Sequence, residues 1–220
     1  MQDKKNLMIK KESVLVSIMA FLSIALIAFS LAVDVFFPAP ETGLTVYDIP
    51  EQSSFINTSS GSNPGAPIDL IVFTDFSCSF CRQTHPELMR IMEDYGDSVN
   101  LVIRHLPRND FSAAAASECA RDQGRFMEFY DALFTTDKQA STIARSLELD
   151  MNKFNSCIES GRKIEVIQQH VQEARANNID ATPVFIINRE MLIGSQDYDS
   201  LEQAIKDQLD PEKITEEILS

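Results

Sequence analysis

The sequence of 220 residues holds one domain of ordinary size and an appendage, because globular domains most often contain about 100 to 200 residues. Its composition, 44% hydrophobic and 24% charged residues, argues against global disorder. The formal net charge is −14, and no basic cluster lies beyond the first dozen residues. Such a chain repels phosphate backbones, so nucleic acid is excluded as a partner.

The first feature along the chain is a run without charges at residues 14–33. As a helix with a rise of about 1.5 Å per residue, this run spans roughly 30 Å, the thickness of a bilayer's hydrocarbon core. Lysines precede it, so the positive-inside bias predicts that residues 1–13 stay in the cytoplasm and that the rest is exported. We expect an uncleaved single-pass anchor in the inner (cytoplasmic) membrane. A cleaved signal peptide is the alternative, and a buried core helix is disfavoured because the run is apolar all round.

The next stretch, residues 34–66, is rich in proline and glycine and predicts a linker with room for one short strand at residues 44–47. The folded domain is expected at residues 67–210. Its first apolar run, residues 68–76, is rich in β-branched and aromatic side chains and predicts a buried strand. A helix at 82–95 and a second strand at 99–106 follow, which together make a β-α-β unit.

The following segment, about 111–178, has helical periodicity and contains no proline. Breaks near Gly124, Asp137, Asp150 and Gly161 divide it into four or five helices, so we expect a helical insertion in an α/β domain. Two paired strands at 183–188 and 190–193 and a closing helix at 198–209 are predicted after it. Residues 211–220 form a tail, and the acidic stretch from Asp207 to Glu217 is expected to be a solvated helix end.

The cysteine pair Cys78-Ser79-Phe80-Cys81 stands where the first strand gives way to the first helix. The positive end of a helix favours a thiolate and lowers a cysteine pKa of about 8.5 into a range of roughly 3.5 to 7.5. We therefore predict Cys78 as the nucleophile, which forms a mixed disulfide with a partner protein. Cys81, one turn along and less exposed, resolves it. This exchange needs no cofactor and no metal.

Two other interpretations of the pair are an inert structural disulfide and half of a zinc site. Zinc requires further ligands at suitable spacing, and Cys119 and Cys157 stand apart from each other, although His85 could add a third ligand. We expect His85 to be a packed or solvated histidine rather than a group that influences the thiolate.

The second pair of cysteines, Cys119 and Cys157, falls in the helical insertion. In an oxidising compartment two buried thiols there are expected to join, and two unpaired thiols are the alternative. A bridge closing this loop of 157 − 119 = 38 residues stabilises a fold by roughly 4 kcal/mol on the chain-entropy model.

The dipeptide Thr182-Pro183 opens a late strand. If this peptide bond is cis, its backbone can lie against the cysteine pair and bind an extended client segment. The apolar area around Phe76, Phe80 and this dipeptide is the predicted client surface.

Four segments together resemble the DsbA-like branch of the thioredoxin superfamily. They are Asp75 to Cys81 (DFSCSFC), Pro86, residues 119–126 (CARDQGRF) and residues 181–188 (ATPVFIIN). The resemblance covers roughly residues 61–209. It implies a thioredoxin fold with a helical insertion, Cys78 as nucleophile, Cys81 as resolving thiol and a cis Pro183 beside them.

Two features depart from that family's pattern. Many members bury an acid six residues before the first cysteine, and here that position is Val72. Asp75 is the nearest carboxylate and is a candidate to relay protons to Cys81, with an ordinary strand-end acid as the alternative. The dipeptide between the cysteines is Ser-Phe rather than the Pro-His of strongly oxidising members, which leaves oxidase, isomerase and reductase open.

The sequence thus predicts an exported, membrane-anchored thiol-disulfide oxidoreductase, an oxidase or isomerase working in a bacterial periplasm. Its expected partners are cysteine-containing client proteins and a membrane redox protein. The alternative is a non-catalytic binding or assembly module of the thioredoxin fold, in which the pair is a structural disulfide. Such a module would resist mild reductant.

Overall fold

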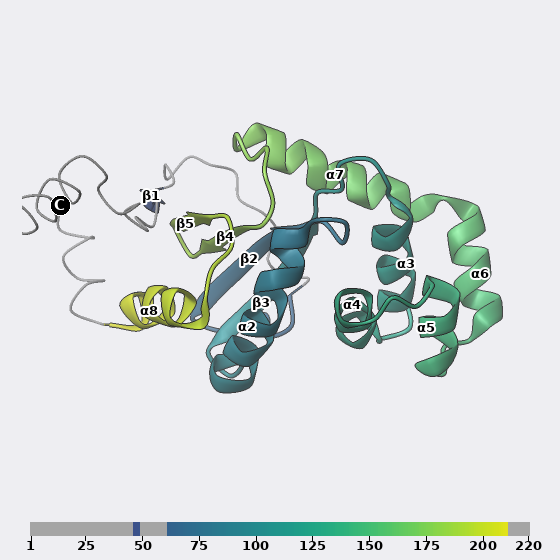
Figure 1. Cartoon of the computed structure of the whole chain (residues 1–220), viewed down its shortest axis with the longest axis horizontal. Coiled ribbons are helices and arrows are strands. Elements are labelled where there is room, and N and C mark those ends of the chain that lie inside the picture. The colour runs from purple at the N-terminus through teal and green to yellow at the C-terminus, as the bar shows by residue number, and fades with distance from the viewer. Residues whose placement is uncertain (1–45, 49–60, 211–220) are drawn as a thin grey trace, which may run out of the picture. The chain divides into compact units, whose positions relative to one another are not determined.

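The structure, a computed structural model, describes residues 46–48 and 61–210 (Figure 1). The strands are β1 (Val46–Asp48), β2 (Ile68–Thr74), β3 (Val99–His105), β4 (Val184–Ile187) and β5 (Glu190–Ile193). The helices are α2 (Ser79–Tyr95), α3 (Ser112–Arg121), α4 (Phe126–Thr135), α5 (Ala140–Ser146), α6 (Met151–Ser160), α7 (Arg162–Ala176) and α8 (Tyr198–Leu209). The strands form one mixed sheet in the order β1-β5-β4-β2-β3.

The centre of the fold is the predicted β-α-β unit. β2 and β3 pair in parallel, from Ile68 opposite Val99 to Thr74 opposite His105, and α2 connects them. The helix begins at Ser79, earlier than the predicted residue 82, and continues through Pro86. Both strands end one or two residues before their predicted ends.

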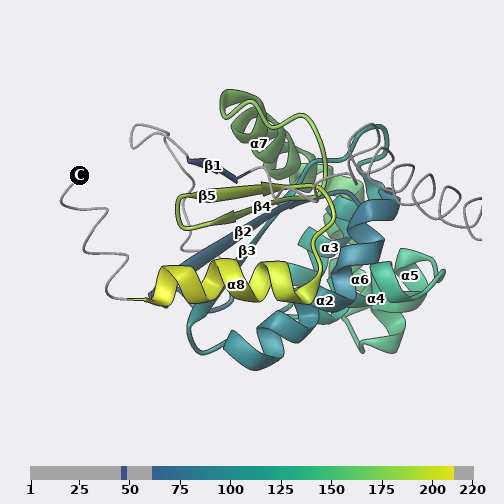
Figure 2. The same cartoon turned by 60° about the vertical axis from the view of Figure 1, so that its left-hand side comes forward.

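The central strands of the sheet carry apolar side chains that point alternately to its two faces. Both faces of these strands are therefore buried. Leu70 and Val72 of β2 belong to the core under α2, α4 and α8, whereas Ile71 and Phe73 pack with Ala174 of α7 on the opposite face. Figure 2 shows α8 and α2 on one side of the strands and α7 on the other. Burying a large aliphatic or aromatic side chain contributes roughly 1.5–3 kcal/mol, so these two layers hold the strand ends in place.

The helical insertion contains the five helices α3 to α7, as its breaks indicate. Gly161 has a φ of +65°, a left-handed backbone that glycine adopts without strain, and it is the residue that ends α6. Gly124, with a φ of +71°, lies in the turn between α3 and α4. Asp137 lies between α4 and α5. The side chain of Asp150 accepts hydrogen bonds from two N–H groups in the first turn of α6, which begins that helix.

The sheet also includes residues that the sequence analysis placed in the linker. β1 pairs antiparallel with β5 and forms an edge of the sheet, from Val46 opposite Leu192 to Asp48 opposite Glu190. The Ser62 N–H donates a hydrogen bond to the Leu101 carbonyl at 3.0 Å. Segments ahead of residue 67 therefore take part in the domain.

None of the helices within residues 46–48 and 61–210 is long and apolar enough to cross a membrane. The predicted anchor at 14–33, the stub at 1–13 and the tail at 211–220 lie outside the described residues.

Candidate active site

The fold brings the cysteine pair to the Thr182-Pro183 dipeptide across more than a hundred residues of sequence. β4 runs antiparallel to β2, and its first residue, Val184, pairs with Phe73 near the end of β2. The dipeptide before β4 therefore faces the residues that follow β2. The Thr182-Pro183 bond is cis, and the Thr182 carbonyl lies 3.3 Å from Cys78 Sγ, so the thiol donates a hydrogen bond to it.

Cys78 is the N-cap residue of α2, and no side chain caps this helix end. Partial burial by itself raises the pKa of the Cys78 thiol. The Thr182 side chain and the N–H groups of Cys81 and Phe80 act against burial by hydrogen bonding to the sulfur, and they hold the pKa below its ordinary value. The first turn contains no acidic residue that would oppose the thiolate. Cys78 is thus both partly exposed and biased toward its nucleophilic form.

Cys81 has the opposite character, with 4% of its surface exposed. Burial raises the pKa of its thiol to about 11, although the backbone of Asp75 and the side chain of Thr74 hydrogen-bond to the sulfur and act in the other direction. Both cysteines are free thiols in this structure. The pair therefore combines a partly exposed thiol of lowered pKa with a buried thiol of raised pKa.

Two side chains beside Cys81 were missed by the sequence analysis. Thr74 is the last residue of β2, and Tyr130 reaches the same place from α4. Burial, followed by the nearby Cys81, raises the pKa of the Tyr130 hydroxyl. Strand length could have suggested Thr74, because it ends the strand before the cysteines. No sequence signal connects Tyr130 with Cys81, since only the folding of the insertion brings them together.

Asp75 is buried at the end of β2, where its carboxylate is already engaged. One oxygen accepts hydrogen bonds from the Ser77 N–H at 2.9 Å and the Ser77 hydroxyl at 2.8 Å. The other accepts from the Arg108 N–H at 3.1 Å. These contacts fix the loop that leads to Cys78 and join it to the loop after β3.

The two aromatic residues of the predicted client surface differ in exposure. Phe80, between the cysteines, is 58% exposed. The Phe76 ring instead packs against the rings of Tyr130, Phe134 and His105, with centroids 4.9 to 5.6 Å apart. Phe80 is therefore exposed to solvent, whereas Phe76 mainly packs beneath the cysteines.

His85 is a packed histidine. It lies buried in α2, its ring stacks on Phe134, and its Nε2 lies 2.8 Å from the Asp131 carboxylate. Within residues 46–48 and 61–210, no group of three or more His, Cys, Asp or Glu side chains could hold a metal ion.

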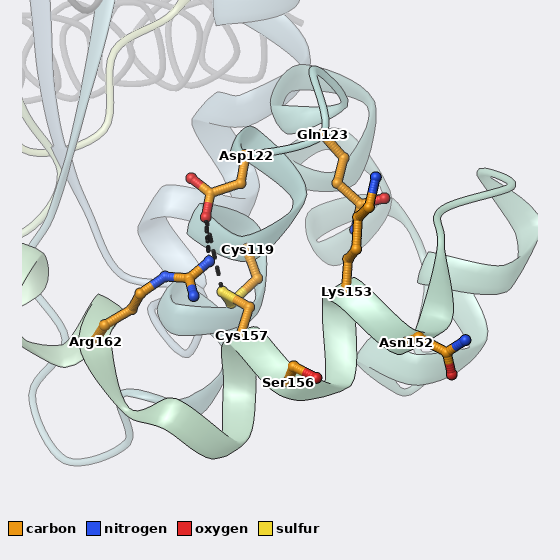
Figure 3. A pocket seen from close by; sticks show the side chains of 8 residues that line it. All are labelled: Cys119, Asp122, Gln123, Asn152, Lys153, Ser156, Cys157 and Arg162. Atoms are coloured by element: carbon orange, nitrogen blue, oxygen red, sulfur yellow. Dashed lines mark hydrogen bonds and ion pairs between the residues drawn. A yellow bond between two sulfur atoms is a disulfide. The ribbon is translucent and has the colours of Figure 1, made fainter.

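Cys119 and Cys157 form a disulfide that joins α3 to α6, with their Cα atoms 5.8 Å apart. The bridge lies at a surface pocket of about 490 Å³ (Figure 3). An oxygen of Asp122 lies 4.0 Å from Cys157 Sγ, and the same carboxylate binds Arg162 at 2.8 Å and Lys163 at 2.6 Å. Because a disulfide sulfur carries no proton, the Asp122 approach to Cys157 is a contact rather than a hydrogen bond.

A second polar cluster, which the sequence analysis did not foresee, lies behind Phe76. His105 Nε2 is 3.1 Å from the Glu118 carboxylate, and the backbone N–H of His105 donates to His170 Nδ1 at 3.2 Å. Burial acts to raise the pKa of Glu118, but hydrogen bonds from His105 and Arg121 outweigh it and lower the pKa to about 2. The contacts of His105 with Glu118 and His170 hold α3 and α7 of the insertion against the end of β3.

The sequence and the fold both match known proteins. Residues 59–207 match the family model described as thioredoxin. The chain belongs to this thioredoxin family. A thioredoxin-like oxidoreductase from Silicibacter pomeroyi has a similar structure, with a TM-score of 0.60 and 26% identity over 66% of this chain and 87% of that one. A periplasmic thioredoxin-like protein from Salmonella enterica gives a TM-score of 0.56 and 25% identity over 71% and 94%.

The chain is also similar to proteins named DsbA and to part of the length of a sodium/proton antiporter. Wolbachia pipientis alpha-DsbA1 shares the fold at a TM-score of 0.62, with 22% identity over 70% of this chain and 91% of that chain. Among sequences, Na(+)/H(+) antiporter NhaA 3 of Salinispora tropica is 31% identical over an alignment of 150 residues that covers 64% of this chain but only 23% of the antiporter. The family model and these neighbouring structures show that this chain has the thioredoxin fold.

Proposed function

We propose that this thioredoxin-family protein is an exported, membrane-anchored oxidase that introduces disulfides into cysteine-containing client proteins. The observation that carries the proposal is the opposite pKa shift of the two thiols, lowered at Cys78 and raised at Cys81. The Cys78 thiolate exists only when the pair is reduced. Hydrogen bonds that stabilise it therefore favour the reduced pair, so the oxidised pair accepts electrons readily.

The proposed reaction begins with the oxidised Cys78–Cys81 disulfide. A client thiolate attacks Cys78 Sγ, a client–Cys78 disulfide forms, and Cys81 leaves as a thiolate that takes up a proton. The client's second thiolate then attacks the client sulfur of the mixed disulfide, and Cys78 leaves as a stabilised thiolate. The client loses two electrons and the pair gains them. A membrane redox protein that carries its own disulfide would take these electrons and restore the oxidised pair.

The proposed location outside the cytoplasm rests on four observations. Residues 14–33 form an uncharged run long enough to span a bilayer. The Salmonella enterica relative is described as periplasmic, and the Salinispora tropica relative is an antiporter of which this chain matches about a quarter. The Cys119–Cys157 disulfide is also typical of proteins in oxidising compartments.

The decisive experiment is to measure the reduction potential of the Cys78–Cys81 pair in glutathione buffers. A C119A/C157A variant assigns the signal to the active-site pair. We expect a value above about −200 mV, in the range of protein-disulfide isomerase and DsbA and not near the −270 mV of thioredoxin. A value near −270 mV would identify a reductase instead. A pair that does not exchange with glutathione would support the non-catalytic assembly module.

Client reshuffling separates the oxidase from the isomerase. The oxidised protein should introduce disulfides into a reduced, unfolded client in a single turnover. The reduced protein should correct a client with wrongly paired disulfides only slowly. Fast correction without net oxidation would assign the protein as an isomerase.

A further inference from the structure

A second cavity, of about 260 Å³, opens beside the reactive sulfur on the side of α7. It lies between the loop after β3, the end of α7 and the loop that leads into β4. Thr182 lines this cavity and also accepts the hydrogen bond from Cys78 Sγ at 3.3 Å. The cavity is therefore next to the place where a client is held during exchange.

The cavity combines apolar walls with two arginines. Leu106 and Ile179 are among the apolar lining residues, and Ile179 is buried. Arg108 and Arg175 line it with exposed side chains. Within residues 46–48 and 61–210, neither guanidinium has a hydrogen-bond or ion-pair partner. The whole chain has a net charge of −14, so two guanidiniums that lack partners among the described residues make this cavity an exception to its acidic character.

Two carboxylates also line the cavity, and they differ in burial and in the hydrogen bonds that they accept. Asp75 is buried, and its oxygens are engaged by Ser77 and by the backbone N–H of Arg108. Asp180 is exposed to solvent. Neither binds a guanidinium within the described residues, so Arg108 and Arg175 remain available to an incoming anion.

The size and position of the cavity limit what it can hold. At about 260 Å³ it is smaller than the roughly 300–1,000 Å³ typical of small-molecule sites, so it suits a side chain better than a cofactor. An extended client advances about 3.3 Å per residue. A side chain one or two residues from the client cysteine bound to Cys78 can therefore reach the cavity. An acidic side chain fits its chemistry, because its methylene groups meet the apolar wall and its carboxylate meets the arginines.

We propose that the Arg108–Arg175 cavity is a specificity subsite that accepts an acidic client side chain within two residues of the reactive cysteine. This inference rests on the proposed function, since it names the client class of the same site. The subsite speeds formation of the mixed disulfide by holding the client segment along Thr182 while its thiolate attacks Cys78.

The test uses short peptides with one cysteine and with Glu, Gln or Lys at each of the two positions on either side of it. Each peptide thiol reduces the oxidised full-length protein under single-turnover conditions. The same peptides react with a small aromatic disulfide, which corrects for the effect of the neighbouring charge on the peptide's own thiol. We expect the best-placed Glu peptide to react about three to ten times faster than its Gln counterpart after this correction, and the Lys peptide to react more slowly.

Two variants with the same change of net charge locate the effect. R108Q/R175Q should abolish the preference for Glu over Gln. R145Q/R189Q removes two exposed arginines outside the cavity and should keep it. Equal rates for Glu and Gln peptides in the unmodified protein, or a preference that survives R108Q/R175Q, would overturn the subsite and leave the oxidase intact. Failure of every peptide to reduce the pair would instead contradict the proposed function.

Discussion

The two cysteine pairs of this chain lie at opposite ends of their helices. Cys78 precedes the first residue of α2, whereas Cys119 lies two residues before the end of α3 and Cys157 three residues before the end of α6. A helix favours an anion at its N-terminus and disfavours one at its C-terminus. A thiolate is therefore stabilised in the first pair and opposed in the second.

Exposure alone does not explain this difference. Cys81 is 4% exposed and Cys119 is 1% exposed, so both pairs contain a buried sulfur. What distinguishes the first pair is that one of its sulfurs faces solvent and a set of hydrogen-bond donors. In the second pair, Cys157 contacts the Asp122 carboxylate, which disfavours a thiolate further. The local field therefore favours a thiolate in one pair and disfavours it in the other.

The strongest test of this comparison is Cys78→Ser. We expect complete loss of oxidation of a reduced client protein, because a hydroxyl cannot form the mixed disulfide. The Cys81 thiol that remains is buried, and its pKa of about 11 keeps it protonated at neutral pH. Client thiol loss and disulfide formation are measured by mass spectrometry. Turnover in this variant would assign the chemistry to another sulfur.

The C119A/C157A variant should show the reverse behaviour. Removing a bridge between residues 38 apart should lower the free energy of unfolding by roughly 4 kcal/mol on the chain-entropy model. The single-turnover rate of client oxidation should stay within a few-fold of the unmodified protein at a temperature where the variant is folded. Denaturant unfolding measures the first quantity, with C78S/C81S as the control that keeps the bridge. A large loss of rate in folded C119A/C157A would contradict a purely structural role.

The asymmetry within the active pair predicts selective alkylation. The pKa of Cys78 is lowered and that of Cys81 is raised to about 11, so at pH 8 a much larger fraction of Cys78 than of Cys81 should be thiolate. Iodoacetamide should modify Cys78 first in the reduced protein, with a rate that falls as the pH drops through the pKa of Cys78. Peptide mapping identifies the modified residue. Equal modification of both cysteines at pH 8 would show that burial does not protect Cys81.

The lowered pKa of Cys78 also connects stability to pH. A thiol whose pKa is lower in the folded state stabilises the fold above its unfolded pKa, and this contribution disappears as the pH falls through the folded value. Cys81 has the opposite sign, because its raised pKa favours the fold below the unfolded value and ceases to do so as the pH rises through about 11. Both effects apply only to the reduced pair.

The sequence predicted the order of elements well, because hydrophobic periodicity and breaking residues are local signals. The breaks at Asp150 and Gly161 mark helix ends through their own capping or backbone chemistry, and Gly124 lies in the turn between two helices. The helix carrying Cys78 was predicted to begin later than it does, because an uncapped N-terminus leaves no capping residue to recognise. The edge strand β1 was only partly foreseen, since its pairing with β5 depends on contacts distant in sequence.

The site residues also divide into those that a local sequence signal indicates and those that depend on contacts distant in sequence. The CxxC spacing indicates Cys78 and Cys81 directly, but the direction in which a ring packs is a tertiary property. Phe76 was predicted at the client surface, and the structure adds that its partly buried ring packs against Phe134. Tyr130 beside Cys81 and Arg175 beside Thr182 depend on how the insertion folds over the sheet, and Arg108 joins them from the loop after β3. No spacing rule could have brought them together.

The smallest expected effect belongs to Thr182→Val, which removes one hydrogen-bond donor from the Cys78 sulfur and leaves the backbone carbonyl of residue 182 in place. A donor to a charged group is worth about 1.5–3 kcal/mol when buried, and less at a partly exposed sulfur, so we expect the Cys78 pKa to rise by up to about one unit. The reduced pair loses the same free energy, which lowers the reduction potential by up to about 30 mV.

Alkylation rate against pH and glutathione titration measure the two shifts, with Thr142→Val on the exposed face of α5 as the matched control. The two shifts should agree in free energy, because both report the stability of one thiolate. An unchanged pKa in T182V would mean that the N–H groups of α2 alone supply the stabilisation, and that Thr182 serves the client rather than the sulfur.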